Sequence, residues 1–141
     1  MNGEYKWADD YAKEMKDIIN MQSDRLVNIA DDIGKKLAQD LKLKMNQIRR
    51  FLDALRKVEQ DYYQLISNNN QELKERVIHN LTMLRPKLAY AAGREKQVKP
   101  LMKILEPAIQ ATTLNPEKGF EKLLRLMEAI IAYHRYYGGS N

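Results

Sequence analysis

Apolar side chains recur every three or four residues along almost the whole chain, and this spacing restricts the possible fold more than any other feature. An α-helix takes 3.6 residues per turn, so such spacing gathers the apolar side chains on one face of each helix. No stretch of useful length shows the strict alternation of a half-buried strand. The sequence therefore predicts an all-α fold, a compact helical bundle of about five to six helices.

Prolines, glycines and polar runs predict where these helices begin and end. We expect helices over about residues 5–21, 23–41, 46–66, 71–94, 96–112 and 116–137. Proline lacks a backbone donor, so Pro86 should kink or restart the fourth helix, and Pro107 should bend or shorten the fifth. The run Asn115-Pro116-Glu117 is the clearest start signal, with a capping side chain followed by proline and an acid.

Three other small residues carry expectations about local structure. Ser23 is expected to cap the second helix, and Gly93 to end the fourth. Gly34 interrupts a helical pattern, which favours either a kink or a close contact with another helix.

Trp7 and Tyr11, one turn apart near the start of the chain, are expected to dock on the bundle.

Length and composition indicate the number of domains and the cellular location of the protein. At 141 residues the chain predicts a single helical-bundle domain, residues 1–141. It contains no cysteine and no targeting or membrane-spanning segment, which favours a cytoplasmic location without membrane contact. Residues 1–34 hold four cations and eight acids, whereas residues 35–94 hold thirteen cations and six acids. A basic middle part is typical of a chain that binds a polyanion, although it also fits plain solubility.

The sequence does not indicate an enzyme, a cofactor or a metal site. His79 and His134 have no cysteine partners and no metal-ligand spacing, and His134 falls on the apolar side of its helix, where a core histidine is expected. The acidic pairs at residues 9–10 and 31–32 are adjacent, so their side chains point in different directions, and we expect them to be solvated. Phosphate-binding glycine loops and nucleophile elbows are missing as well.

Cations and tyrosines recur together on the predicted helices of the basic middle part. Arg49 and Arg56 form one helical column with Tyr63, and Arg76, Lys87 and Arg94 share an arc with Tyr90. If the two helices pack as antiparallel neighbours, we expect these two columns to border one groove. Tyrosines stack on exposed bases and cations hold phosphates, which is how single-strand grooves are built, although a solvated helix face explains the same pattern. For Tyr62 and Tyr133 we expect core packing instead. The residues expected to contact phosphate are Arg49, Arg50, Arg56, Lys57, Arg76, Lys87, Arg94 and Arg135.

Three motifs, in order, resemble the small-subunit family of Csm-type (type III-A) CRISPR interference complexes. They are Gln47-Ile48-Arg49-Arg50-Phe51, then Leu88-Ala89-Tyr90-Ala91-Ala92-Gly93-Arg94, and finally the helix from Glu128 to Tyr137. Arg49, Arg50 and Arg94 match motif positions, whereas Arg56, Lys57 and Arg76 are chosen from helical geometry alone. The first third of the chain carries no matching motif. The resemblance also allows Gly93 to be a site of close approach and not a helix end.

The resemblance implies a non-catalytic small subunit that stacks in a filament and binds guide RNA and target RNA in antiviral defence. Its implied partners are those RNAs, the other subunits of a Csm-type complex and further copies of itself. The residues alone lead more weakly to a basic helical module without an active site. A basic helical adaptor that binds an acidic protein remains the alternative, and competition by RNA would separate the two.

Overall fold

The computed structural model describes residues 5–141, in which helices are present and strands are not. This confirms the predicted all-α bundle. Over these residues the chain forms α-helices joined by short 3₁₀ and π segments. The α-helices are α1 (Lys6–Met15), α2 (Ser23–Lys35), α3 (Met45–Asn68), α4 (Gln71–Thr82), α5 (Leu84–Arg94), α6 (Lys99–Leu114) and α7 (Pro116–Tyr136). The segments η1 (Ile18–Asn20) and η3 (Lys96–Val98) are 3₁₀ turns, and η2 (Lys36–Asp40) is a π turn.

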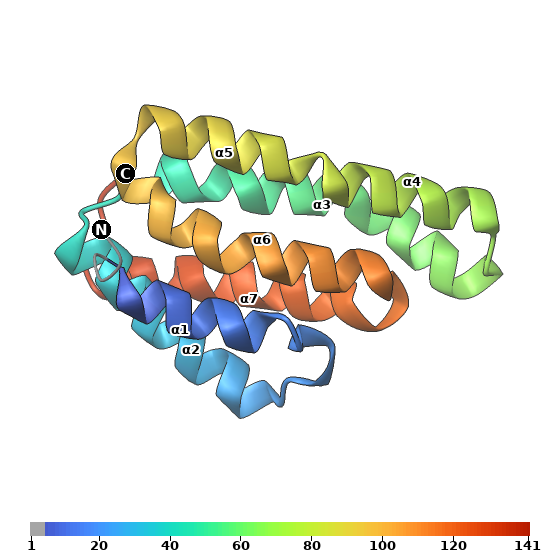
Figure 1. Cartoon of the computed structure of the whole chain (residues 1–141), viewed down its shortest axis with the longest axis horizontal. Helices are drawn as coiled ribbons and strands as arrows, with labels where there is room; N and C mark the ends of the chain where they lie inside the picture. The colour runs from blue at the N-terminus through green and yellow to red at the C-terminus, as the bar shows by residue number, and fades with distance from the viewer. Residues whose placement is uncertain (1–4) are drawn as a thin grey trace.

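The helices lie side by side as three hairpins (Figure 1). The central hairpin consists of α6 and α7, with α1 packed mainly on α6 and α2 packed mainly on α7. On the opposite side, α3 packs on α7, while α4 and α5 run nearly in line and return along α3. The basic middle part of the sequence therefore forms one outer hairpin, and the acidic first part forms the other.

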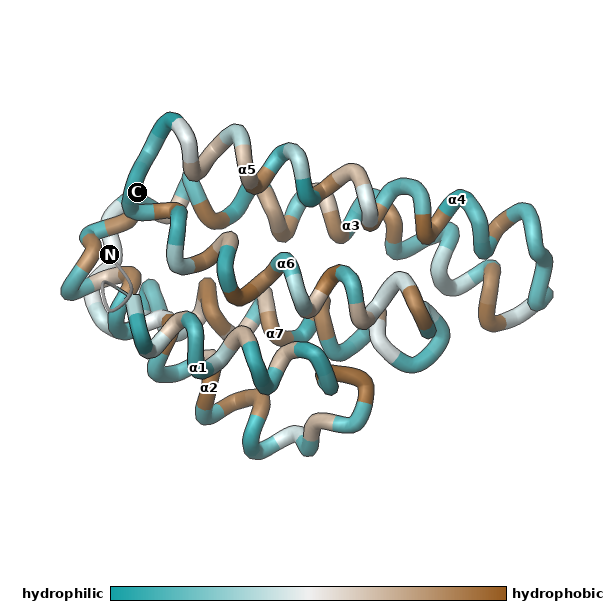
Figure 2. Tube along the Cα trace, viewed as in Figure 1, coloured by the Kyte–Doolittle hydropathy of each residue, from teal (hydrophilic) through white to brown (hydrophobic). Residues whose placement is uncertain are grey.

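One continuous cluster of buried apolar side chains connects the three hairpins. Every helix contributes to it, and Figure 2 shows hydrophobic and hydrophilic residues alternating along each helix, as amphipathic helices require. Ile48, Leu88 and Phe120 are almost completely buried. A cavity lined only by apolar side chains, among them Leu88, has a volume of about 10 Å³, so the centre of the core is tightly packed.

The break between α4 and α5 falls near Pro86, as expected. α4 ends at Thr82 and α5 starts at Leu84, which leaves Pro86 in the first turn, where its missing N–H costs no hydrogen bond. This restart divides the predicted fourth helix into α4 and α5, which gives seven α-helices between residues 5 and 141. The Asn115 side chain accepts a hydrogen bond from the Lys118 N–H at 3.3 Å, which confirms the cap of α7.

Two of the local expectations are wrong. Ser23 is the first residue of α2 and not its cap, because Gln22 takes the extended conformation before the helix. Gly93 lies inside α5, which continues to Arg94 and ends at an extended Glu95. Of the two effects expected of Pro107, shortening does not occur, since α6 runs on to Leu114, and a bend stays the prediction.

Gly34 makes the close helix contact that was one of its two expected roles. A Cβ atom at this position would lie 2.7 Å from the Cβ of Tyr133 and 2.8 Å from the backbone N of His134. Both atoms belong to α7 and are fixed by its backbone. The missing side chain therefore lets α2 and α7 approach each other closely.

Of the two acidic pairs, Asp10 is exposed as predicted, whereas Asp9, Asp31 and Asp32 are only partly exposed and bind partners, so the prediction of solvated side chains is wrong for these three. Asp9 pairs with Lys103 of α6 at 3.1 Å, and Asp31 accepts a hydrogen bond from the Tyr137 hydroxyl at 2.5 Å. This bond raises the pKa of Tyr137 to about 12. The adjacent carboxyls do point in different directions, because Asp32 instead binds α1 and its own helix.

Asp32 connects the first two helices. Its carboxylate accepts a hydrogen bond from the Tyr11 hydroxyl at 2.5 Å and pairs with Lys36 at 2.8 Å. Burial alone would raise the pKa of this carboxyl, but the hydrogen bonds from Lys36 and Tyr11 outweigh burial and hold the pKa below 3.8. Trp7 and Tyr11 pack against the core, so the aromatic pair docks on its own bundle as expected.

His134 is completely buried, as its place on the apolar side of α7 predicts. Its Nε2 lies 2.5 Å from the Leu43 carbonyl oxygen. The chain then turns back, so that the Met45 N–H donates to the Ser140 carbonyl at 2.7 Å, which joins the C-terminal residues to the start of α3.

The far end of the α3–α4 hairpin projects beyond the rest of the bundle (Figure 1). We call residues 66–72 the tip, and all of them are exposed. At its base, the Tyr62 ring stacks on Phe120 with 4.6 Å between centroids, and Lys74 pairs with Glu117 at 3.2 Å. The buried Tyr62 therefore confirms the expectation of core packing.

Candidate nucleic-acid interface

A surface groove of about 900 Å³ runs between α3 and α5. Arg50 and Lys57 line it from α3, and Lys87 and Tyr90 line it from α5. Met83 lies between α4 and α5 on the same groove. We call this feature the α3/α5 groove.

The amphipathic pattern of the two helices explains which side chains reach this groove. Arg50 and Lys57 each precede a buried residue of α3, Phe51 and Val58, so both cations lie along the border of the buried face. They are seven residues apart, about two turns or 10 Å along the helix axis. On α5, Leu88 is buried. Lys87 and Tyr90 are close to it in the sequence, and both lie on the same side of the buried face.

A second basic surface lies on the other side of α3, where α3 meets α7. Arg56 pairs with Glu128 at 3.0 Å, and Arg125 pairs with the same carboxylate at 2.8 Å. Burial opposes ionisation of Glu128, yet the hydrogen bonds from the two arginines prevail and lower its pKa. The helices are antiparallel, so a step of seven residues along each places Arg49 opposite Arg135 on this surface.

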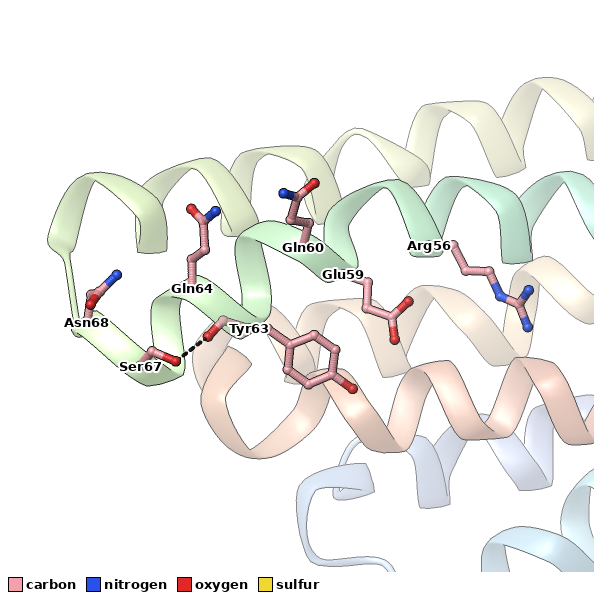
Figure 3. A pocket seen from close by; sticks show the side chains of 7 residues that line it. All are labelled: Arg56, Glu59, Gln60, Tyr63, Gln64, Ser67 and Asn68. Carbon is pink, nitrogen blue, oxygen red and sulfur yellow. Dashed lines mark hydrogen bonds between the residues drawn. The ribbon is translucent and has the colours of Figure 1, made fainter.

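The hollow beside this second surface carries no net positive charge. It has a volume of about 640 Å³ and is lined by α3 alone (Figure 3). Arg56 and Glu59 supply one charge of each sign, and amides and hydroxyls complete the lining. The Ser67 hydroxyl donates to the Tyr63 carbonyl at 3.0 Å, which uses up one of these groups. This hollow offers little attraction to a polyanion.

The structure separates arginines that the sequence analysis placed along one groove. Arg49 and Arg56 were expected to border a groove with the cations of the following helices, but the α3/α5 groove contains Arg50 and Lys57 in their place. Neighbouring residues on a helix differ by about 100° in direction, so a shift of one position selects the other side of α3. The prediction is therefore wrong about which cations of α3 line the groove, whereas Lys87 of α5 lines it as predicted.

The remaining predicted cations differ in how they are paired. Arg76 pairs with Asp61 at 3.4 Å, and Arg94 lies one turn beyond Tyr90 with its guanidinium 5.8 Å from the centre of that ring. Within residues 5–141, six of the eight predicted cations form no ion pair: Arg49, Arg50, Lys57, Lys87, Arg94 and Arg135. All six are exposed.

Two polar residues of the groove were missed by the sequence analysis. Asp53 lies between Arg50 and Lys57 on α3, and Asn80 lines the groove from α4. Their position one turn from the predicted cations was visible in the sequence, but the side of α3 that faces α4 and α5 was not. In the part of the chain that the structure describes, no cluster of three or more histidine, cysteine or acidic side chains could hold a metal ion. None of the helices described has the length and apolarity that a membrane crossing requires.

Fold and surface together define a helical-bundle protein with a groove in which unpaired cations stand beside an exposed tyrosine. Comparison with known proteins identifies the family. The chain belongs to the Csm2 Type III-A family, whose model matches residues 20–140. This confirms the family resemblance of the three motifs.

A relative supports the same assignment. The chain is 27% identical over 77 residues to the CRISPR system Cms protein Csm2 of Streptococcus thermophilus. The match covers 55% of this chain and 64% of that protein, so it spans less than two thirds of the relative's length. No solved structure matches the chain.

Proposed function

We propose that this protein is the non-catalytic small subunit of a cytoplasmic type III-A CRISPR effector complex. It stacks with further copies of itself in a filament beside the other subunits, and it binds guide RNA and target RNA through its basic helical surfaces. Membership of the Csm2 family supports the assignment to such a complex. Binding of RNA is proposed from the surface of this chain.

One observation carries the RNA-binding part of the proposal. Arg50, Lys57 and Lys87 converge on the α3/α5 groove, where Asp53 is the one carboxylate among the lining residues. None of the three cations is consumed by an ion pair within residues 5–141, in contrast to Arg56 and Arg76. Unpaired cations along a groove attract a phosphate backbone regardless of its base sequence.

The second surface extends the same argument around α3. Counted from the Arg56–Glu128 pair, Arg49 and Arg135 lie about two turns along their antiparallel helices, and neither forms an ion pair in the described chain. α3 thus presents unpaired arginines on both of its exposed sides. A subunit placed between two RNA strands, or between two stretches of one strand, would use both sides.

The test is the salt dependence of RNA retention by the assembled complex. Arg50→Gln combined with Lys87→Gln removes two cations of the α3/α5 groove, and each lost phosphate contact lowers the log–log salt slope by about 0.7 for a single strand. The double variant should therefore lower the slope by about 1.4 if each side chain holds one phosphate. Folding should be unaffected, because both side chains are exposed.

Lys13→Gln with Lys16→Gln serves as the matched control, because it removes the same charge from exposed positions on or next to α1, in the other outer hairpin. This control should leave the slope unchanged. An equal drop in both double variants would indicate a general charge effect and would remove the support for the groove. Displacement of RNA by an acidic protein, with no effect of the groove variant on RNA, would favour the adaptor alternative.

A further inference from the structure

Tyr90 is unusual among the aromatic side chains of this protein because it lines the α3/α5 groove while 66% of it is exposed. Tyr62, by comparison, is only 4% exposed and stacks on Phe120. Tyr136 is 77% exposed but lies edge-on to the Tyr137 ring, 5.0 Å away. Aromatic rings normally bury most of their area, so an open ring inside a groove is available to a ligand.

The surroundings of Tyr90 indicate what kind of ligand fits. On α5, Lys87 and Arg94 lie one turn before and one turn after Tyr90, and the Arg94 guanidinium is 5.8 Å from the ring centroid. Met83, 45% exposed, lies two turns before Tyr90 along the same column. A flat apolar surface with cations on either side fits a unit that has a planar ring between two negative charges. An unpaired nucleotide base between its flanking phosphates has that form.

Across the groove, α3 supplies the other cations. α3 runs antiparallel to α4 and α5, and Arg76 of α4 pairs with Asp61 of α3. Counting back from this pair places Arg50 opposite the Lys87–Tyr90 turn and Lys57 opposite Asn80. The volume of about 900 Å³ is within the range of roughly 300–1,000 Å³ found for small-molecule sites, so a nucleotide unit fits.

We propose that Tyr90 is a stacking platform for one unpaired base of single-stranded RNA, held in the α3/α5 groove with its flanking phosphates on Arg50 and Lys87. This inference depends on the proposed function, since it names the part of the RNA that the basic groove takes. Asp53 repels phosphate, so the base and not the backbone lies on the side of the groove that holds this carboxylate. There, Asp53 accepts hydrogen bonds from a base amino group, and the Asn80 amide both donates and accepts.

The experiment uses the full chain and a single-stranded oligoribonucleotide that contains 2-aminopurine, whose fluorescence is quenched when it stacks on an aromatic ring. Wild type and Tyr90→Phe should quench it, because both keep the ring. Tyr90→Leu should lose the quenching and bind roughly fivefold or more weakly, as expected for one lost base stack. Tyr136→Leu is the matched control, an equally open tyrosine outside the groove, and should behave as wild type.

A second strand of the same length without bases separates stacking from phosphate contact. Tyr90→Leu should bind this abasic strand as tightly as wild type does, whereas Arg50→Gln should weaken binding to both strands. If Tyr90→Leu binds and quenches the base-containing strand like wild type, the stacking site is wrong and RNA binding by the basic surfaces still stands. If wild type binds neither strand, the RNA-binding part of the proposed function fails instead.

Discussion

At the scale of single residues, two glycines with opposite surroundings allow a direct test of the packing. Gly34 is pressed against the α7 backbone, whereas a Cβ atom at Gly93 would meet nothing within 4 Å. Both lie within helices, so each carries the backbone entropy cost of glycine. Only the first has a structural reason for it within this chain.

Gly34→Ala should therefore lower the free energy of unfolding by about 1–3 kcal/mol, the usual cost of overpacking a core. The new Cβ would contact the Tyr133 Cβ and the His134 backbone, neither of which can rotate away. Gly93→Ala should instead raise the free energy of unfolding by about 0.5–1 kcal/mol. Urea unfolding of both variants measures these changes, and a neutral Gly34→Ala would show that α2 and α7 can separate at no cost.

The sequence predicts best those residues whose position depends on one helix alone. The buried positions of Leu88, Tyr62 and His134 follow from the period of their helices, and all three are confirmed. The sides of α3 were assigned less well, because Arg49 and Arg50 differ only in which neighbouring helix they face. That choice is made by packing between helices, which the period of one helix does not contain.

At the scale of elements, the stability that Asp32 adds by joining α1 and α2 should depend on pH. The folded-state pKa of Asp32 lies below its ordinary value of 3.8, because Lys36 and Tyr11 bond to the charged carboxylate. A depressed pKa adds stability that is complete above pH 3.8 and is lost as the pH falls through the lower folded value. Asp32→Asn should remove this contribution, about 1 kcal/mol for a partly exposed pair.

Denaturant unfolding of wild type and Asp32→Asn at pH 7 and at pH values below 3.8 tests this expectation. The difference in free energy of unfolding should be present at pH 7 and should shrink at low pH. A difference that stays constant over this range would mean that the carboxylate charge is not what joins the two helices.

Helix ends show how far local sequence reasoning reaches. Asn115 caps α7 and Pro86 marks the start of α5, because a capping oxygen and a missing N–H act within one turn. Gly93 did not end α5, since a glycine permits the left-handed conformation without requiring it. Residue Asn69 takes that conformation at the end of α3 with φ of 48°.

At the scale of the whole molecule, the continuous core predicts one cooperative transition for the proposed single domain, residues 1–141. Leu88 lines the 10 Å³ apolar cavity together with side chains from α3, α6 and α7. Leu88→Ala should enlarge this cavity and lower the free energy of unfolding by about 2–5 kcal/mol. Circular dichroism and tryptophan fluorescence should report the same midpoint in the variant, and separate midpoints would contradict a single cooperative unit.

The fold class was predictable from the sequence, whereas the arrangement of the hairpins was not. Helical period fixes which face of each helix is buried, and it does not say which helices meet. The central position of α6 and α7 comes from contacts between distant segments, such as Lys122, whose amine bonds the carbonyls of Ile19 and Met21. The α3/α5 groove also depends on contacts between distant segments. The sequence therefore predicted the types of residue that line it, cations and a tyrosine, but not which cations of α3 do so.

The projecting tip has a practical consequence, because the chain contains no cysteine. Asn68→Cys would place one thiol at the exposed end of α3, beyond the contact of Tyr62 with Phe120 of α7. A fluorophore attached there would be the only thiol-linked label on the protein and would stand clear of the α3/α5 groove. Energy transfer from that dye to a labelled RNA end would then give the direction in which a bound strand runs along the subunit.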